Sequence, residues 1–364
     1  MSSATHDEAV LAGRLILAGF DGTALPDRIA RDLERGALAG IVLFSRNVES
    51  PAQVRRLTDE ARRAAGGSPA PIVAVDQEGG RVVRLRDPLT VLPPARTLGA
   101  IDDPELTELA GRLVGAELRA VGFTLDLAPV LDVDTNPDSP VIGDRSYGAS
   151  PAAVMRHGLA FARGLKDGGV LPCAKHFPGH GRAAVDSHLS LPRVDCDRES
   201  LEAVELEPFC AWCRTGLGPV MIAHAVYPAF DPEGPATASR SVVRGELRER
   251  LRFGGAVLSD DLEMGAVGES GGPAAVAVRA LAAGVDGMLV CRSAEVLDEV
   301  RDGLARALSS EPGLLRRVEI ASCRLAALGE PPGPDVDLDW LESADHRAAR
   351  SLVTERIRGA TEQS

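Results

Sequence analysis

The sequence has very little lysine and few aromatic side chains. Only two lysines occur in 364 residues, Lys166 and Lys175, and aromatic residues make up 3% of the chain. Hydrophobic residues nevertheless amount to 45%, so alanine, valine and leucine must fill most of the core. A chain of this length can bury one large α/β domain or two smaller ones.

Runs of basic residues and long apolar runs are also missing. A formal net charge of −13 without a basic cluster argues against nucleic acid or an anionic membrane as a partner. No stretch approaches the roughly 18 uninterrupted apolar residues that a membrane span needs. The first 20 residues carry Asp7 and Glu8 and lack the basic start of a secretory signal. We therefore expect a cytoplasmic protein that binds small solutes.

Cysteine is sparse as well. Six cysteines are too few for a disulfide scaffold in a chain this long, and a cytosolic location would keep them reduced. Cys210 and Cys213 match the C-x-x-C pattern of redox and metal sites. They lie in a segment of helical pattern, 199–216, with no second pair of ligands nearby. We interpret them as buried helix residues.

Short apolar runs alternate with longer segments of helical period along most of the chain. Three of these segments, 50–66, 103–122 and 151–169, end in glycine, and Ser50 is a candidate N-cap. Eight strand–helix units in about 300 residues predict an α/β fold, a single (β/α)₈ TIM-type barrel. An open doubly wound sheet is the alternative, but no G-x-G-x-x-G follows the first strand. The predicted strands lie at 14–20, 40–45, 71–76, 123–129, 171–177, 219–224, 256–261 and 287–291.

The C-terminal part carries helical patterns without chemical motifs. Helices are expected at 313–328 and 340–359, joined by a proline-rich connection. We therefore predict one domain over 1–364, with a barrel at about 14–310 and a helical tail at about 311–364 packed on it.

Polar side chains end several of the predicted strands. In a barrel the active site lies where strands end and the following loops begin, so these residues are the candidates for chemistry. A buried charge without a partner costs several kcal/mol. Several unrelated buried charges are therefore a poor explanation for so many polar residues at the strand ends. The residues at strand ends are Asp76, Lys175, His176, His224 and Asp260, and Asp126 lies within the fourth predicted strand.

The loops after these strands add further candidates. Arg84 follows the Gly79-Gly80 turn of "VDQEGGRVVRL", and Arg145 lies in the proline-broken loop 136–148. Asp186 and His188 stand two residues apart in the loop after the fifth strand. Such a pair can combine an orienting carboxylate with an imidazole that exchanges protons near neutral pH.

Taken together, these segments resemble a known family. The motifs "VDQEGGRVVRL", "VIGDRSYG", "AKHFPGHG", "DSHLSLP", "MIAHAVYP" and "VLSDDLEM" are similar to those of the bacterial β-N-acetylhexosaminidases of glycoside hydrolase family 3. This is the single-domain group that trims N-acetylglucosamine from cell-wall muropeptides. The resemblance runs from about residue 14 to 292, and K-H-F-P-G-H-G followed by D-S-H is its most specific part.

The resemblance implies a role for each candidate. Asp260, rather than the neighbouring Asp261, would be the nucleophile of a retaining exo-hydrolase, and His188 the general acid/base held by Asp186. A covalent glycosyl-aspartate would form, without any metal or cofactor. The substrate would be a glycoside with terminal β-linked N-acetylglucosamine, and the family analogy favours a monomer. The sugar would be bound by Asp76, Arg84, Arg145, Lys175 and His176.

Other functions remain open on the sequence alone. A metal-dependent hydrolase could draw ligands from His176, His180, Asp186 and His188, although Phe-Pro-Gly between the first two keeps them off one helix face. An imidazole acid/base would also suit a phosphorylase, because a phosphate ion could approach the glycosyl intermediate without repulsion from a carboxylate acid/base. A β-glucosidase of the same family and a non-catalytic sugar-binding barrel are further alternatives. The aglycone, the contacts to the N-acetyl group and the roles of His180 and His224 are not assigned.

Overall fold

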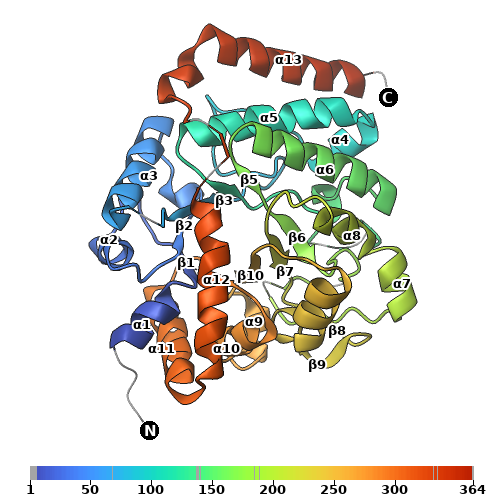
Figure 1. Ribbon diagram of the computed structural model, residues 1–364. Helices are drawn as coiled ribbons and strands as arrows, with labels where there is room; N and C mark the ends of the chain where they lie inside the picture. Colours follow the sequence, from blue (N-terminus) through green and yellow to red (C-terminus); the bar gives the residue numbers. More distant parts are fainter. Residues whose placement is uncertain are drawn as a thin grey trace.

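The computed structural model is built around a parallel β-barrel (Figure 1). It describes residues 6–67, 69–136, 139, 141–183, 185–187, 189–330, 332–333 and 335–362. The barrel strands are β1 (Ile16–Ala18), β2 (Gly40–Leu43), β3 (Ile72–Val75), β4 (Leu125–Asp126), β5 (Leu171–Pro172), β6 (Ala174–Phe177), β7 (Val220–Ile222), β10 (Val257–Asp261) and β11 (Gly287–Val290).

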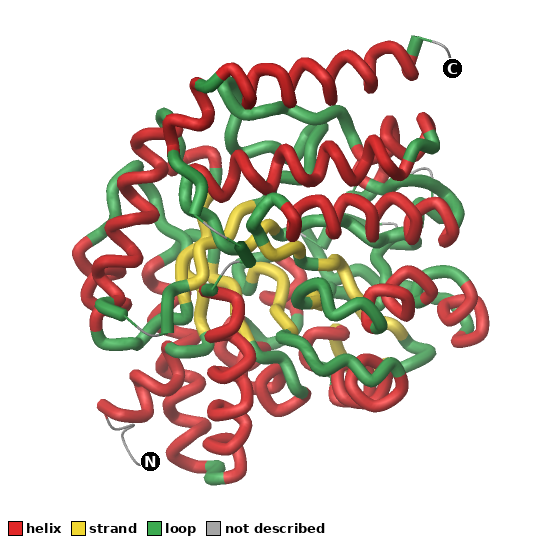
Figure 2. The backbone as a smooth tube through the Cα atoms, turned by 45° about the horizontal axis from the view of Figure 1, so that its top comes forward, coloured by secondary structure: helices red, strands yellow, loops and turns green. Residues whose placement is uncertain are grey.

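The sheet closes through an interrupted fifth strand. Its strand order is β5-β4-β3-β2-β1-β11-β10-β7-β6, with all pairs parallel. Only Cys173 separates β5 from β6, so the two ends of this order are halves of one strand. The result is an eight-stranded barrel. Figure 2 shows its strands surrounded by helices. The prediction of a single (β/α)₈ barrel is confirmed, and each strand lies within or overlaps its predicted run.

The helices that cover the barrel begin and end at the predicted signals. Ser50 accepts a hydrogen bond from the backbone N–H of Gln53 at the start of α3, and Gly66 ends that helix in the left-handed region. The helices before the C-terminal tail are α1 (His6–Gly13), α2 (Asp27–Glu34), α3 (Pro51–Ala65), α4 (Ala95–Ile101), α5 (Pro104–Ala120), α6 (Pro151–Asp167), α7 (Arg198–Ala203), α8 (Glu207–Cys213), α9 (Gly265–Glu269) and α10 (Pro273–Ala283), with a π-helix at Ser241–Arg250.

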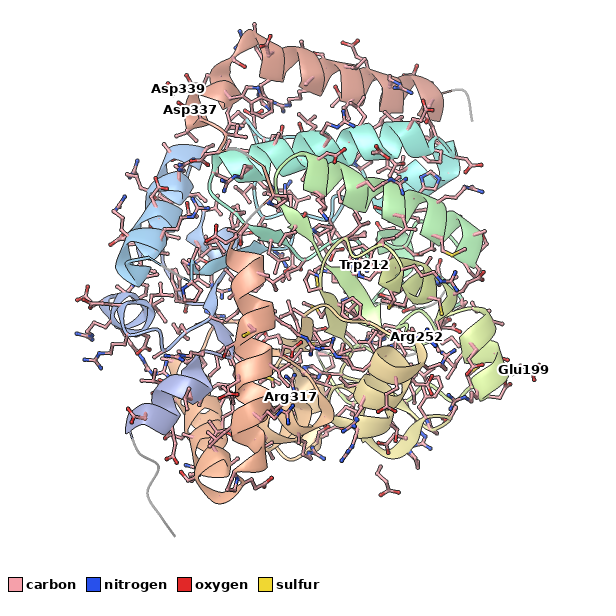
Figure 3. All side chains as sticks on the ribbon, viewed as in Figure 1. Glu199, Trp212, Arg252, Arg317, Asp337 and Asp339 are labelled. Atoms are coloured by element: carbon pink, nitrogen blue, oxygen red, sulfur yellow. The ribbon has the colours of Figure 1, made fainter. Side chains whose placement is uncertain are left out.

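Two local features differ from the sequence prediction. The helical segment 199–216 is divided into α7 and α8, because Glu205 turns inward between them and its side chain is fully buried. A short antiparallel hairpin, β8 (Val226–Tyr227) with β9 (Asp231–Pro235), follows β7 and has no counterpart in the prediction. The C-x-x-C cysteines lie in α8 as expected, but they are half-buried. Trp212 between them is the fully buried residue of this motif (Figure 3).

The helices that follow the last strand, β11, pack on the barrel, as predicted. They are α11 (Ala294–Ser310), which lies in the predicted barrel segment, and α12 (Gly313–Gly329) and α13 (Ala344–Thr361), which lie in the predicted tail. Arg317, which lies on α12 (Figure 3), forms an ion pair with the fully buried Asp286. α13 lies along α5 (Figure 1), where His346 Nε2 is 2.8 Å from Glu117 Oε1. None of the described helices is long and apolar enough to cross a membrane.

Candidate active site

A pocket of about 170 Å³ opens at the carboxyl ends of the barrel strands. Its wall combines side chains from β6, β7, β10 and β11 with residues that follow β2, β3, β4, β6 and β11 in the chain. Catalytic groups of this architecture lie at this end of the barrel. The lining residues are Phe44, Asp76, Glu78, Val82, Arg84, Leu127, Val141, Arg145, Lys175, His176, His180, Ser187, Met221, Asp260, Asp261, Leu289 and Cys291.

Lys175 occupies the centre of a buried charge network in this pocket. Its Nζ lies 2.7 Å from Asp76 Oδ1 and 2.6 Å from Glu78 Oε1. Burial lowers the pKa of Lys175, but the two carboxylates outweigh it and raise the pKa above its usual range. The ammonium group therefore stays charged, and a compact cation with several donors fits this position better than a guanidinium.

Glu78 links the lysine to Arg145. Arg145 Nε and Nη2 each lie 2.8 Å from a carboxylate oxygen of Glu78, which makes the pair bidentate. Burial raises the pKa of Glu78, but Arg145 and Lys175 together bring it far below its usual range. A permanently ionised glutamate thus fixes both cations in place.

Arg84 is held more loosely at the rim of the pocket. Its Nη2 lies 3.4 Å from Asp76 Oδ2, and its guanidinium carbon lies 5.3 Å from the centre of the Phe44 ring. Nε of Arg84 is buried without a hydrogen-bond partner among the described residues. This donor capacity suits a ligand that offers hydroxyl or carbonyl oxygens.

His176 is oriented by a carboxylate beneath the pocket. Its Nδ1 lies 2.7 Å from Oδ2 of Asp132, a residue with no exposed surface. The backbone N–H groups of His176 and His180 also donate to the Asp132 carboxylate, at 3.2 and 2.6 Å to Oδ1. Burial raises the pKa of Asp132, but the adjacent His176 outweighs it and lowers this pKa. The arrangement leaves Nε2 of His176 as the ring nitrogen available to a ligand.

His180 is buried beside it with its ring edge-to-face against His176, the centroids 5.9 Å apart. Burial, assisted by the nearby His176, lowers the pKa of His180 to about 4. The ring is therefore neutral near pH 7, and its Nε2 lies 3.2 Å from Ser187 Oγ. A proton-transfer role would need a pKa closer to neutrality, so we interpret His180 as a structural residue that contacts His176 and Ser187.

Asp260 and Asp261 follow one another at the end of β10 and differ in their electrostatics. Asp260 Oδ1 accepts a hydrogen bond from the Asp261 N–H at 2.8 Å. Burial raises the pKa of Asp260, but His176, His224 and this N–H together lower it. Burial also raises the pKa of Asp261, in this case to about 7. Asp260 is thus the carboxylate that is ionised throughout the neutral range.

His224 supports the backbone of this acidic pair from outside the pocket lining. Its Nε2 lies 3.1 Å from the carbonyl oxygen of Asp261, and its Nδ1 lies 2.8 Å from Thr237 Oγ1. The ring is almost fully buried, and this burial lowers its pKa. An imidazole held between a hydroxyl and a backbone carbonyl helps to fix the backbone that carries Asp260 and Asp261.

The predicted sugar-binding residues and the predicted nucleophile all line this one pocket. Asp186 is described but is not among its lining residues, although its neighbour Ser187 is. His188 lies outside the described residues, so its position relative to Asp260 stays a prediction. Asp126, the candidate within the fourth predicted strand, lies fully buried outside the pocket lining and accepts a hydrogen bond from the Gln77 N–H at 2.9 Å.

Two residues of the network were not among the sequence candidates. Glu78 stands in the "DQEGG" turn, and an acid two residues after a strand-ending Asp76 was the signal available for it. Asp132 lies in the apolar run "LAPVLDVD" and is 44 positions from His176. A single buried acid without a local partner gave no indication of this contact.

The metal alternative can be compared with the described part of the pocket. Within that part, no group of three or more His, Cys, Asp and Glu side chains is arranged to hold a metal ion. Nδ1 of His176 is directed to Asp132, which leaves only Nε2 for any other ligand. His188 belongs to the proposed ligand set but lies outside the described residues.

Comparison with known proteins identifies the family. The model of the glycosyl hydrolase family 3 N-terminal domain matches residues 13–325. A β-hexosaminidase of Thiobacillus denitrificans is 43% identical over 288 residues, 77% of this chain and 78% of the relative. The structure of a family 3 β-N-acetylglucosaminidase from Paenibacillus sp. superposes with a TM-score of 0.87 at 36% identity, covering 96% of this chain and 68% of the other.

NagZ from Neisseria gonorrhoeae superposes with a TM-score of 0.81 at 34% identity, covering 93% of this chain and 96% of the other. The family model spans most of the chain, and these relatives match it over nearly their whole length or most of it. The chain therefore belongs to glycosyl hydrolase family 3 and is a glycoside hydrolase.

Proposed function

We propose that this enzyme is a retaining exo-β-N-acetylhexosaminidase that releases terminal β-linked N-acetylglucosamine from muropeptides or related glycosides. The single observation that carries the proposal is the pocket itself, which Asp260, with its lowered pKa, lines together with Asp76, Glu78, Arg84, Arg145 and Lys175. The names of the relatives, β-hexosaminidase and β-N-acetylglucosaminidase, support the N-acetylated sugar as the substrate.

Asp260 would attack the anomeric carbon and form a glycosyl ester. A nucleophile must be ionised, and the low pKa of Asp260 meets this need where the raised pKa of Asp261 does not. The Asp261 side chain also forms hydrogen bonds with the backbone, since its Oδ1 accepts hydrogen bonds from the N–H groups of Glu263 and Cys291. These contacts favour Asp260 over Asp261 as the nucleophile.

His188, held by Asp186, would serve as the general acid/base. It would protonate the leaving oxygen in the first step and take a proton from water in the second, so that the β configuration is kept. Lys175, His176, Arg145, Arg84 and Asp76 would bind the sugar hydroxyls. Donors fixed by Glu78 and Asp132 need little rearrangement when charge develops in the transition state.

Hydrolysis is preferred here to phosphorolysis because the pocket has no surplus of positive charge. Its three cations, Arg84, Arg145 and Lys175, face four acidic side chains among the lining residues. Glu78 and Asp76 directly neutralise Lys175 and Arg145. A phosphate ion would therefore find no unpaired cation among these three.

Trapping of the intermediate tests the proposal. A slow fluorinated N-acetylglucosaminide should label the wild-type enzyme with one sugar, located on Asp260 by peptide mass spectrometry, whereas Asp260→Ala should stay unlabelled. Product analysis with and without phosphate should yield free N-acetylglucosamine in both cases. Label on another carboxylate, or release of a sugar 1-phosphate, would overturn the corresponding part of the proposal.

A further inference from the structure

The segment 76–94 joins β3 to α4 and supplies Asp76, Glu78 and Arg84, among others, to the pocket wall. We call this segment, which is described throughout and contains no helix, the β3 loop. Asp76 and Glu78 both bind Lys175 closely, whereas the ion pair of Arg84 with Asp76 is 3.4 Å long. The position of Arg84 therefore depends mainly on how the backbone of the loop is held.

Gln77 holds the first part of the β3 loop from the barrel side. Its Oε1 accepts the N–H groups of Arg84 and Leu85 at 2.9 and 3.1 Å, and its Nε2 donates to the carbonyl oxygen of Leu85 at 2.8 Å. Gln77 is itself buried, and its N–H donates to Asp126 Oδ1. These contacts fix the backbone of Arg84 on one side only.

The C-terminal helix α13 holds the next part of the loop from the outside. Nη2 of Arg350 donates to Asp87 Oδ1 at 2.9 Å, and Nη1 donates to the carbonyl oxygen of Pro88 at 3.0 Å. Asp87 comes three residues after Arg84 in the chain. One guanidinium of α13 thus binds two successive residues of the β3 loop close to the pocket arginine.

A second contact of α13 reaches the loop through α5, along which α13 lies (Figure 1). His346 Nε2 lies 2.8 Å from Glu117 Oε1, and the Glu117 carboxylate accepts the hydroxyl of Thr90 at 2.7 Å and its N–H at 2.9 Å. All three side chains are buried. His346 and Arg350 are four positions apart and so lie on the same face of the helix. This face of α13 therefore holds loop residues 87–90.

We propose that α13 controls the affinity of the pocket for its sugar, with Arg350 as the positioning residue that keeps Arg84 at the rim. The inference rests on the proposed function, because the ligand is the sugar assigned there. The family model matches residues 13–325, so α13 lies beyond the matched segment. Arg350 acts through the β3 loop and does not line the pocket.

The barrel geometry indicates that this control acts on binding rather than on chemistry. With β5 and β6 counted as one strand, β3 and β10 are four strands apart in either direction around the barrel, so they lie on opposite sides. A sugar whose anomeric carbon faces Asp260 on β10 would meet Arg84 with its far end. A contact far from the reacting bond contributes equally to substrate and transition-state binding, so its loss raises KM without lowering kcat.

The substitution Arg350→Ala tests the inference. It should raise KM for nitrophenyl N-acetyl-β-glucosaminide, and the inhibition constant of free N-acetylglucosamine, by about 3- to 5-fold, the scale of one half-exposed ion pair. The value of kcat should stay within about twofold of wild type. Arg350→Lys keeps a cation beside Asp87 and should recover part of the affinity.

Arg356→Ala is the matched control, because Arg356 lies on the same helix and its Nη2 donates to Asp103 Oδ2 at 2.8 Å, at the start of α5. This variant also loses an ion pair that attaches α13 but should keep the wild-type KM. Arg84→Ala should raise KM, and the double variant Arg84→Ala with Arg350→Ala should raise it no further, because Arg350 acts through Arg84. Thermal unfolding checks that each variant is folded.

The outcomes separate this inference from the proposed function. If the wild-type enzyme neither hydrolyses the glycoside nor binds N-acetylglucosamine, the proposed function is wrong. If wild type does both but Arg350→Ala matches Arg356→Ala, lowers kcat instead of raising KM, or keeps its full effect when Arg84 is absent, only the role of α13 is overturned.

Discussion

Nδ1 of His176 lies 2.7 Å from Oδ2 of Asp132, and the same carboxylate receives two backbone N–H groups from the segment that carries this histidine. The contact fixes both the rotation and the tautomer of a ring that lines the pocket. Asp132 itself has no exposed surface and does not line the pocket. It therefore acts on a ligand only through His176 and His180.

The substitution Asp132→Asn should weaken the function of His176 without removing it. An amide cannot accept all three hydrogen bonds and carries no charge, so kcat/KM should fall by about 10²-fold as the ring loses its orientation. Stability should fall by about 1–3 kcal/mol in urea unfolding, because buried donors lose their acceptor. Asp134→Asn, a nearby acid paired with Arg96, is the control for the kinetic effect.

The same substitution has a defined pH dependence. The pKa of Asp132 is lowered by folding, so the carboxylate contributes stability above its unfolded pKa of about 3.9 and loses it as the pH falls through the folded value. The difference in the free energy of unfolding between wild type and Asp132→Asn should be constant from pH 6 to pH 8 and should decrease at lower pH. A gap that stays open at the lowest pH would contradict the ionic role.

Glu78 gives a second prediction, because it neutralises two cations at once. Glu78→Gln would leave Arg145 without its bidentate partner and Lys175 with Asp76 alone. We expect a loss of about 3 kcal/mol in the free energy of unfolding, as for other broken buried ion pairs. Phosphate or sulfate should now inhibit competitively with the sugar substrate, since uncompensated cations face the pocket.

Glu233→Gln is the matched control for this experiment, because Glu233 is an exposed glutamate on β9. It should change neither stability nor anion inhibition. If Glu78→Gln bound anions no better than this control, the view of Glu78 as the counter-charge of Lys175 and Arg145 would be wrong.

The proposed acid/base should be recognised by its dependence on the leaving group. His188→Ala should lower turnover of a methyl glycoside by about 10²–10⁴-fold and of a nitrophenyl glycoside far less. Asp260→Ala should abolish turnover of both, because every substrate needs the nucleophile. Steady-state rates on a series of leaving groups provide the measurement, and equal losses for His188→Ala across the series would rule it out as the acid.

The sequence revealed the barrel because each strand is a short apolar run and the helices carry recognisable caps. It also revealed Asp76, Lys175 and Asp260, because charged residues that directly follow apolar runs lie at the carboxyl ends of parallel strands. The strands themselves are buried on both faces, which makes such charges stand out in the pattern.

The residues that hold these side chains in place left no such pattern. Asp132 lies in a largely apolar run and contacts His176 only because the fold brings together segments that are 44 positions apart. From the sequence, Glu78 is only one acid of a polar turn; in the fold, Lys175 of β6 and Arg145 of the loop 136–148 both contact it. Contacts between distant segments depend on strand register and loop path, which local periodicity does not encode.

The raised pKa of Asp261 leads to a final prediction, on the pH dependence of stability. Burial raises this pKa to about 7 in the folded chain, so the folded state holds a proton that the unfolded state has already released. Stability should therefore fall as the pH rises from the unfolded pKa through about 7. Asp261→Asn removes the titrating group. The free energy of unfolding of this variant minus that of wild type should therefore rise by on the order of 1–3 kcal/mol from pH 5 to pH 8.

Urea unfolding at several pH values tests this expectation, with Asp167→Asn as the control because that carboxylate is exposed on α6. The control should leave the pH profile unchanged. Because Asp261 adjoins the proposed nucleophile, the substitution should also remove any decline in kcat that coincides with this titration. A relative stability that is flat with pH would mean that Asp261 is already ionised in the folded enzyme, and the electrostatic reason for preferring Asp260 would then be lost.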